Sequence, residues 1–467
     1  MRLADLSLKI VLRSGANRYR LSSVTAIMGD PKLRGRQSPQ STWYPYYPGF
    51  SENFARDVLS KASIDPGGWV LDPWNGSGTT VSVANSLGMN AHGYDLNPVM
   101  ILVAKGRCLD SANYNSLGPL TLDIARKAKK SFDADLNDPL STWFSSESVE
   151  AIRSIEAAVQ KLLIDSGYYK NMTHCLVDDV SDLAAFFYVA IFRTIRELLH
   201  PFLTSNPTWV KRPTSHNSRV RPSAETIREV FIRNSTEMSS VASPKFSATG
   251  RGQKVIRVAS SEQIPLLNDT VGCVLASPPY CTRIDYAVAT SPELALLGYA
   301  LDDEFDGLRR ELIGTSTVPR TAPKASMEMG TTCLHFLDAL SKHSSKASST
   351  YYYKNHIQYF HSMGASLSEI ARVLKPGGAC VLVVQDSYYK DIHNDLPAIV
   401  AEMAALRTLR LREKRDFKLT RTLAGVNPGA REYRTSFSAV ESVLSFEALL
   451  STQKADQTHS PYHQANP

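Results

Sequence analysis

Cysteine is scarce in this chain, and the motifs of several common enzyme classes are missing. The 467 residues include 6 cysteines without a C-x-x-C pair, so neither a zinc site nor a disulfide framework is predicted, and a reducing cytoplasm is the expected location. No apolar run approaches the ~20 residues that a membrane span requires. A Walker lysine, an H-E-x-x-H pair and a G-x-S-x-G elbow are also missing, and the 11 histidines show no ligand spacing, so no metal site is predicted.

A glycine-rich stretch at 72–80, with the sequence D-P-W-N-G-S-G-T-T, follows a short apolar run at 69–71. This pattern predicts a buried strand, a tight turn and then a helix from Thr79. Gly76 and Gly78 allow the turn and a close approach of the backbone to a ligand, and the N-terminus of the helix favours a polar or anionic group. The stretch is therefore a candidate cofactor site.

A second strand is predicted to end at Asp95, seventeen residues after Gly78. This is about the spacing at which nucleotide-binding α/β folds place the carboxylate that holds ribose hydroxyls. For the glycines alone, a surface loop that only resembles a nucleotide site is the alternative. The pairing with Asp95 favours the interpretation as a ribose-binding site.

The stretch Ser277–Tyr280, S-P-P-Y, follows an apolar run at 271–276 that predicts another buried strand. In open α/β sheets, ligands bind at the carboxyl ends of the strands. The two consecutive prolines have no N–H, which leaves the carbonyls of Ser277 and Pro278 free to accept hydrogen bonds from an amine. Tyr280 offers an aromatic face on which a planar base could stack. For an isolated P-P-Y, a proline turn that caps a strand is the simpler alternative.

The two stretches together resemble the S-adenosylmethionine-dependent amino-methyltransferases that act on DNA, in the group with an S-P-P-Y signature. The glycine stretch is similar to the family's cofactor loop, D-P-F-x-G-S-G-T-T, with Trp74 where phenylalanine is usual. The resemblance covers roughly 40–108 and 255–450. One departure is V-A-S-S at 258–261, where many relatives carry G-D-A against the adenine of the cofactor.

The resemblance implies a Rossmann-like α/β methyltransferase sheet with helices on both faces, S-adenosylmethionine as the cofactor and no metal. In this family a short aromatic segment, here 47–51, precedes the cofactor loop and closes over the methionine end of the cofactor. The cofactor-binding residues that the resemblance implies are Tyr47, Phe50, Asp72, Pro73, Gly76, Ser77, Gly78, Thr79, Thr80, Asp95 and Asn97. The catalytic residues that it implies are Ser277, Pro278, Pro279 and Tyr280.

Residues 109–254 are more than a crossover between two strands requires, and we expect a mainly helical insertion. Apolar residues recur at helical spacing from Val149 to Leu163, and 183–199 is apolar on most sides before Pro201 ends the pattern. The expected organisation is a flexible N-terminal extension (1–39), a methyltransferase catalytic domain (40–108 and 255–450), the helical insertion with a basic arm (109–254) and a disordered tail (451–467).

Basic residues gather between 206 and 257, where ten Lys and Arg face three Glu, a surplus of seven that equals the formal charge of the whole chain, +7. A solvated linker explains any one of these residues. Beside a base-modifying site, the stretch is better interpreted as an arm that contacts the phosphate backbone of DNA. A second basic stretch at 407–434 is a candidate for the other side of the cleft. The predicted nucleic-acid contacts are Lys211, Arg212, Arg219 and Arg221.

The predicted reaction is direct transfer of the sulfonium methyl group to the exocyclic amine of a base that has left the duplex stack. The Pro278 carbonyl and the Ser277 side chain would bind the two N–H groups, make the nitrogen lone pair available and accept developing positive charge. By the family resemblance, a serine at the first position of the signature favours cytosine N4 over adenine N6.

Several alternatives stay open. Adenine N6 is one, and an RNA guanine-N2 methyltransferase with similar motifs is another, although the sequence before Tyr47 is short for the RNA-binding domain that such enzymes usually carry. A protein-glutamine methyltransferase carries N-P-P-Y, and the basic stretches argue against it. A non-catalytic nucleic-acid-binding module is the alternative from a different class, and the intact Asp72, Asp95 and Ser277–Tyr280 argue against it. The sequence gives neither the recognition site nor the oligomeric state.

Overall fold

Seven strands form the central sheet of the structure, a computed structural model in which residues 29–32, 39–44, 49–128, 137–164, 174–204, 209–242, 252–281, 284–300, 302–419 and 439–449 are described. In chain order the strands are β1 (Trp69–Asp72), β2 (Asn90–Asp95), β3 (Lys254–Val258), β4 (Val271–Ala276), β5 (Leu374–Gln385), β8 (Leu409–Leu419) and β9 (Ala439–Ala448). A separate hairpin consists of β6 (Ser387–Tyr389) and β7 (Ile392–Asn394).

The order of the strands across the sheet is β3-β2-β1-β4-β5-β9-β8. The five strands from β3 to β5 pair in parallel, and β9 is antiparallel to both of its neighbours. The chain runs outward from β1 through β2 to β3 and then returns to β4, on the other side of β1. The order therefore reverses between β1 and β4, and the carboxyl ends of these two strands form the crevice in which such sheets bind ligands.

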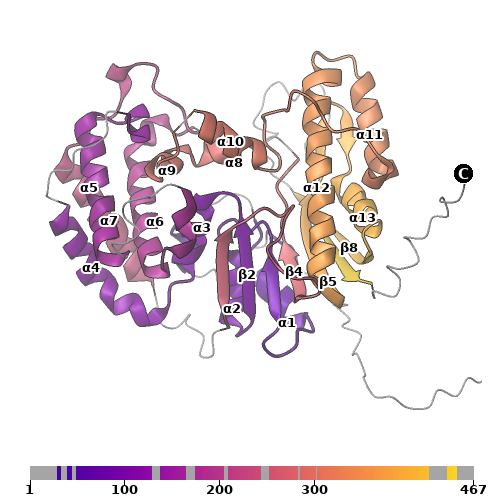
Figure 1. Cartoon of the computed structure of the whole chain (residues 1–467), viewed down its shortest axis with the longest axis horizontal. Coiled ribbons are helices and arrows are strands. Elements are labelled where there is room, and N and C mark those ends of the chain that lie inside the picture. The colour runs from indigo at the N-terminus through magenta and orange to yellow at the C-terminus, as the bar shows by residue number, and fades with distance from the viewer. Residues whose placement is uncertain are drawn as a thin grey trace, which may run out of the picture.

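Helices cover both faces of the sheet (Figure 1). One face packs against α1 (Glu52–Lys61), α2 (Thr79–Ser86) and α3 (Pro98–Arg107), and the other against α11 (Thr331–Lys342), α12 (Tyr353–Val373) and α13 (Leu396–Ala405). Successive strand residues divide between the two cores, as a period of two requires: Val381 lies in the first and Leu382 in the second. The predicted α/β sheet with helices on both faces is confirmed.

A lobe of four helices stands beside the sheet, at the left of Figure 1: α4 (Tyr114–Lys127), α5 (Ser146–Leu163), α6 (Asp182–Leu198) and α7 (Ala224–Val241). Serine side chains cap three of these helices, as at Ser181, whose Oγ accepts a hydrogen bond from the Ala184 N–H. The helix α6 packs between α3 and the rest of the lobe, which explains why it is apolar on most sides. The four helices lie within the predicted insertion, and its boundaries at 109 and 254 stay a prediction.

Three short helices follow the S-P-P-Y stretch: α8 (Tyr286–Ala289), α9 (Ser291–Leu296) and α10 (Asp303–Glu311). In Figure 1 they lie at the top, between the helical lobe and α12. Two arginines of the lobe hold this segment by its carbonyl groups: Arg153 donates to Leu296 O (2.5 Å), and Arg196 donates to Ala289 O (2.5 Å). The lobe is thus part of the architecture around the carboxyl edge of the sheet.

Two predicted regions fall largely or wholly outside the described residues. Of the N-terminal extension, only 29–32 and Pro39 are described, and the tail from 451 is not described at all. Among the residues that the structure does describe, no helix is long and apolar enough to cross a membrane.

Candidate active site

The glycine loop, residues 73–78, joins β1 to α2 at the point where the strand order reverses. Gly76 and Gly78 both have a positive φ, 47° and 80°. A Cβ at Gly78 would lie 2.7 Å from the Cβ of Ala104 in α3, so this position also requires glycine for the close approach of the helix. The loop therefore has the shape predicted from its glycines.

A buried arginine supports the loop from behind. The Nη1 atom of Arg107 donates to the main-chain oxygen and the Oγ of Ser77 at 2.7 and 2.8 Å, and it lies 3.4 Å from the Oγ1 of Thr79. Its Nη2 atom forms an ion pair with Glu52 of α1 at 2.9 Å. The side chains of Ser77 and Thr79 thus point toward Arg107, and this contact holds the loop in place.

Two carboxyl groups shape the ends of β1 and β2. Asp95 accepts hydrogen bonds from the N–H groups of Gly76 (2.8 Å) and Asn97 (2.9 Å), one at each carboxylate oxygen. Asp72 accepts one from the Trp74 N–H at 3.1 Å. Burial raises the pKa of Asp72 to about 7 and that of Asp95 to about 6, and the hydrogen bonds that each group accepts act in the opposite direction. Asp95 thus ties the glycine loop to the end of β2.

The S-P-P-Y stretch leaves the end of β4 and is held by main-chain groups and tyrosines. Ser277 Oγ donates to the Val383 carbonyl of β5 at 3.1 Å, so the lone pairs of this hydroxyl can accept further hydrogen bonds. The Pro279 carbonyl accepts from the Tyr359 hydroxyl at 2.9 Å. The Tyr280 N–H donates to the Tyr286 hydroxyl at 3.3 Å, and the Tyr280 side chain is buried.

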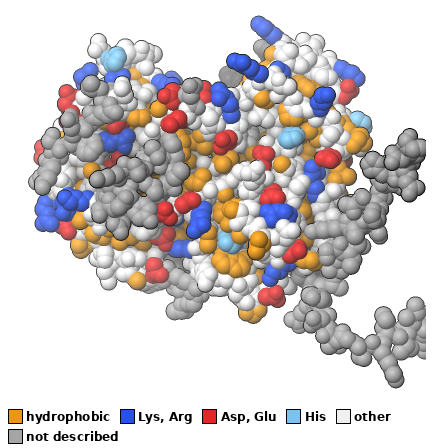
Figure 2. Space-filling view, in the orientation of Figure 1, with side chains coloured by type: hydrophobic (Ala, Val, Ile, Leu, Met, Phe, Trp, Pro, Cys, Tyr) orange, Lys and Arg blue, Asp and Glu red, His pale blue; other side chains and the backbone are white. Residues whose placement is uncertain are grey.

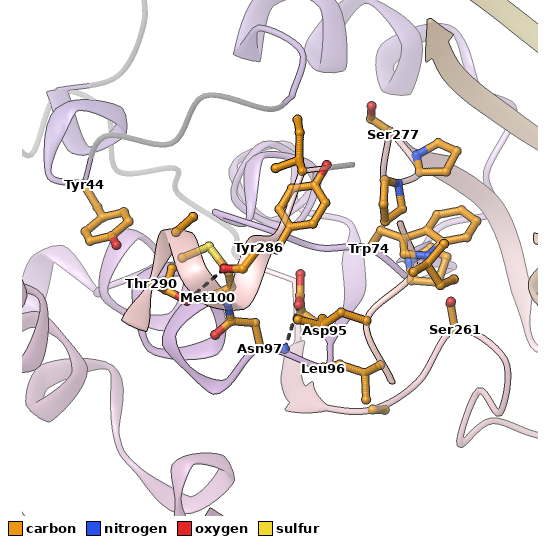
Figure 3. Close-up of a pocket in the computed structure, with 18 of the residues that line it drawn as sticks. Tyr44, Trp74, Asp95, Leu96, Asn97, Met100, Ser261, Ser277, Tyr286 and Thr290 are labelled. Carbon is orange, nitrogen blue, oxygen red and sulfur yellow. Dashed lines mark hydrogen bonds between the residues drawn. The ribbon is translucent and has the colours of Figure 1, made fainter. Parts of the chain in front are cut away.

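The two stretches meet in one cavity (Figure 3). Asp95 lies at its centre, with Trp74 and Ser277 on one side and Tyr286 opposite. The lining is mostly apolar and aromatic, as is usual for small-molecule sites. The lining residues are Tyr44, Pro73, Trp74, Asp95, Leu96, Asn97, Met100, Arg196, Ala259, Ser261, Ser277, Pro278, Pro279, Ile284, Tyr286, Ala289, Thr290, Leu312 and Ile313.

A second cavity adjoins the first and is polar. The two share Leu96, Leu312 and Ile313, so these side chains form the boundary between them. Ser260 and Glu262, which follow β3, line the polar side. The V-A-S-S segment at 258–261, which departs from the family pattern, therefore borders both cavities.

At the end of the first cavity farthest from Ser277, an ion pair joins the helical lobe to α9. Arg196 of α6 pairs with the fully buried Glu293, and the Tyr44 hydroxyl donates to the same carboxylate at 3.0 Å. Burial raises the pKa of Tyr44, with Glu293 acting in the same direction. Asn97 at this end caps α3 by accepting from Val99 N–H and donates to Thr290 Oγ1 at 2.9 Å (Figure 3). Sequence reasoning missed Arg196 and Glu293, because nothing near them in the sequence marks the contact.

The predicted nucleic-acid contacts lie on the loop between α6 and α7. The side chains of Lys211 and Arg212 are exposed, and the Arg212 guanidinium stands 6.0 Å from the ring centroid of Phe305 in α10. Arg221 is exposed and Arg219 is half-buried. Figure 2 shows a notch between the helical lobe and the α11–α12 side, with Lys and Arg side chains near its rim. In the second basic stretch, residues 420–434 lie outside the described part of the chain.

The structure brings only part of the predicted cofactor set to the cavity. Pro73, Asp95 and Asn97 line it. Thr80 instead donates to the Leu275 carbonyl at 3.0 Å, and Phe50 packs against Phe54 with ring centroids 5.4 Å apart. Tyr47 lies outside the described residues. Ser277, Pro278 and Pro279 line the cavity. Tyr280 is not among the lining residues, and its N–H donates to Tyr286, which is; the role of each residue stays a prediction.

Comparisons with known proteins show which families the sequence is similar to. Residues 31–106 match the model of a family described as DNA methylase, of the N6 and N4 type. Over 274 residues the chain is 23% identical to the type II methyltransferase M.BsoBI of Geobacillus stearothermophilus, a match that covers 55% of this chain and 52% of that protein. It is also 20% identical over 404 residues to the type II methyltransferase M.AvaI of Nostoc sp., which covers 79% of both chains.

These matches show similarity to the amino-methyltransferases among the DNA methylases, whose cofactor is S-adenosylmethionine. The first of the two matches spans about half the length of the curated relative. Among solved structures, the antibiotic-resistance methyltransferase Kmr aligns with 50% of this chain and 77% of its own at 14% identity, with a TM-score of 0.18. Within the described residues, no group of His, Cys, Asp and Glu could hold a metal ion.

Proposed function

We propose that this protein transfers the methyl group of S-adenosylmethionine to an exocyclic amine of a DNA base, with N4 of cytosine as the target. The observation that carries the proposal is that Asp95 and the stretch Ser277–Pro279 line one cavity at the switch point of the sheet. This shared cavity supports a role for Asp95 toward the cofactor ribose and a role for Ser277–Pro279 toward an amine.

The residues of the cavity fit the cofactor at three points. Asp95 retains carboxylate lone pairs for the ribose hydroxyls. The apolar boundary at Leu96 and Ile313 suits the adenine ring, with Glu262 and Ser260 beyond it as polar groups for the adenine amine. Trp74 Nε1 is buried and has no hydrogen-bond partner within the described residues, so it is available for an acceptor such as the methionine carboxylate.

The remaining lining groups suit an amine. The Ser277 hydroxyl already donates to Val383, which leaves its oxygen as an acceptor, and within the described residues no donor contacts the Pro278 carbonyl. Two acceptors side by side can take both N–H groups of an exocyclic amine, favour a pyramidal nitrogen and stabilise the positive charge that develops on it. The bound cofactor would supply the electrophilic methyl group, and the proton that the methylated nitrogen loses would leave to water, since a hydroxyl and a peptide carbonyl accept hydrogen bonds but are too weakly basic to take a proton.

Cytosine N4 rests on the serine at the first position of the signature, and adenine N6 is the second candidate. The choice of DNA as the polymer rests on the family match and on the exposed side chains of Lys211 and Arg212, the second of which stands against Phe305 of α10. A role in a restriction-modification system, like those of the type II relatives, and a cytoplasmic location complete the proposal.

The purified protein should be incubated with cofactor that carries a labelled methyl group and, in separate reactions, with unmodified DNA, total RNA or protein. Label in DNA alone is the expected result. Label in RNA or protein alone would reject the proposed substrate. Cofactor binding without label in any polymer would support the non-catalytic alternative.

A further inference from the structure

One lysine brings together three segments that are far apart in the chain. The Nζ atom of Lys32 donates to the Gly49 carbonyl at 2.6 Å and to the Tyr280 hydroxyl at 3.4 Å. It also forms an ion pair with Glu441 of β9 at 3.5 Å. The aromatic segment before the glycine loop, the S-P-P-Y stretch and the central sheet therefore meet at a single ammonium group.

The backbone around Lys32 is anchored on both sides. The Lys32 N–H donates to Asp30 Oδ1 at 2.8 Å, and the Ser51 N–H donates to the Pro31 carbonyl at 2.8 Å. Ser51 in turn caps α1 by accepting from the Phe54 N–H. Residues 29–32 are thus fixed to the start of α1, and the lysine side chain extends from a defined position.

Glu441 is fixed as well, because it lies inside β9 and pairs with Gln385 of β5 and Phe417 of β8. The residue is 1% exposed, and its Oε2 atom has no hydrogen-bond partner within the described residues. A buried carboxylate without a counterion is costly, and Lys32 is the cation beside it. An ion pair between Lys32 and Glu441 is enough to neutralise the buried carboxylate. The contact of Lys32 with the Tyr280 hydroxyl is therefore an additional interaction.

The hydroxyl is the atom of Tyr280 farthest from its backbone, and a donor there restrains the tilt of the ring. The opposite end of the residue is restrained too, because the Tyr280 N–H donates to Tyr286. A ring restrained at its hydroxyl, on a backbone that is itself held, is pre-organised to stack on a flat ligand, which lowers the entropy lost on binding.

We infer that Lys32 is a positioning residue, which holds the ring of Tyr280 in the orientation that stacks on the extruded base, with Glu441 as its fixed counterion. The inference rests on the proposed function, together with the base-stacking role that the sequence predicts for Tyr280. It adds a role for residues 29–32, which belong to the N-terminal stretch 1–39 that the sequence predicts to be a flexible extension.

A double-mutant cycle tests the inference. Lys32→Met removes the donor, Tyr280→Phe removes the acceptor, and the double variant removes both. If Lys32 acts through the hydroxyl, each single variant lowers the turnover number on unmodified DNA by about fivefold to tenfold, and the double variant is no slower than either one. Cofactor affinity stays within about twofold, because neither group lines the cavity.

Lys32→Gln keeps a donor without the charge, and it should retain most of the turnover of the wild type while Lys32→Met does not. In the Tyr280→Phe background the two substitutions should be equivalent. Lys346→Met, at an exposed lysine, is the matched control and should have no effect. If Lys32→Met unfolds the protein, Tyr280→Phe still decides, because full turnover of that variant would show that the contact between Lys32 and the Tyr280 hydroxyl has no role.

Two failures are distinguishable in this experiment. A wild-type protein that methylates no base in DNA overturns the proposed function. A wild-type protein that methylates DNA, together with losses that multiply in the double variant or with full activity of Lys32→Met, overturns the role of Lys32 alone.

Discussion

The two halves of the cavity are built from the chain in different ways. The glycine-loop half, residues 69–107, is one continuous segment in which β1, α2, β2 and α3 follow each other, and its main supports, Asp95 and Arg107, lie within it. The S-P-P-Y half is assembled from distant parts of the chain, because Ser277–Tyr280 contact Val383, Tyr359 and Lys32. The first half is a local unit of a nucleotide-binding fold, and the second depends on the whole tertiary structure.

This difference predicts where substitutions act. A change in the glycine-loop half should disturb cofactor binding and local stability together, since one network serves both. A change in the S-P-P-Y half should lower the turnover number and leave the cofactor affinity unchanged. Substitutions in and around the two halves test this division, and the largest effect is expected at Arg107.

Arg107→Ala should be the most damaging single change in the glycine-loop half. It leaves Glu52 without its partner and removes two hydrogen bonds to Ser77, and breaking a partly buried ion pair of this kind costs about 3–5 kcal/mol. Chemical denaturation and cofactor calorimetry should both report the loss. Arg126→Ala is the matched control, because the Arg126 side chain is 73% exposed and pairs with Asp123 on the same helix. A stable Arg107→Ala variant with normal cofactor affinity would show that the loop does not need this support.

Asp95→Ala should weaken cofactor binding by roughly 1–3 kcal/mol, or about tenfold to a hundredfold, because buried donors then lose their acceptor. Isothermal calorimetry measures the change. Asp65→Ala, at an exposed carboxylate before β1, should leave the affinity as it is. Unchanged affinity in a folded Asp95→Ala variant would remove the ribose assignment and, with it, the functional interpretation of the glycine-loop half.

The stability of the same half should depend on pH through Asp72. Its pKa in the folded protein, about 7, lies above the ordinary value of 3.8, so the folded state takes up a proton that the unfolded chain does not. The contribution of this group to stability therefore rises as the pH falls from about 7 to about 4, and is constant below that. Urea denaturation between pH 5 and pH 8 should show a weaker rise on acidification for Asp72→Asn than for wild type. Equal slopes would mean that Asp72 is ionised in the folded protein across this range.

Charge reversal of Lys211 and Arg212 should have the smallest effect on the cavity, because these side chains are exposed and lie outside both halves. Binding to all DNA sequences should weaken alike, and the log–log salt slope should fall by about one unit for each phosphate that the protein no longer neutralises. Lys61→Glu, in α1, is the control for net charge. An effect confined to one DNA sequence would instead assign these residues to base readout.

The same division explains which residues of the site could be predicted from the sequence and which could not. Gly76, Gly78 and Asp95 could be found because local backbone geometry and a fixed spacing require them, and the structure gives both glycines a positive φ. The cofactor role implied for Ser77, Thr79 and Thr80 is less direct, because their side chains contact Arg107 or the Leu275 carbonyl rather than the cavity.

Contacts between segments that are far apart in the chain leave no recognisable pattern in the local sequence. Arg107, Arg196 and Lys32 are ordinary charged residues in the sequence, and only the packing of α3, α6 and the N-terminal segment places them at the site. Tyr286 is a similar case, because the turn after the two prolines brings its ring into the cavity, six residues beyond Tyr280. Ser277 could be identified as a site residue, whereas its bond to Val383 depends on the pairing of β4 with β5.

The most direct test of the central claim is the identity of the modified nucleoside. DNA methylated by the purified protein should be digested to nucleosides and separated by mass spectrometry. If the Ser277–Pro279 stretch binds an exocyclic amine beside the cofactor, the product is N4-methylcytosine. N6-methyladenine would correct the choice of base and keep the amine mechanism. A methyl group on a ring carbon, or no methylated nucleoside from a protein that binds the cofactor, would contradict the proposed mechanism.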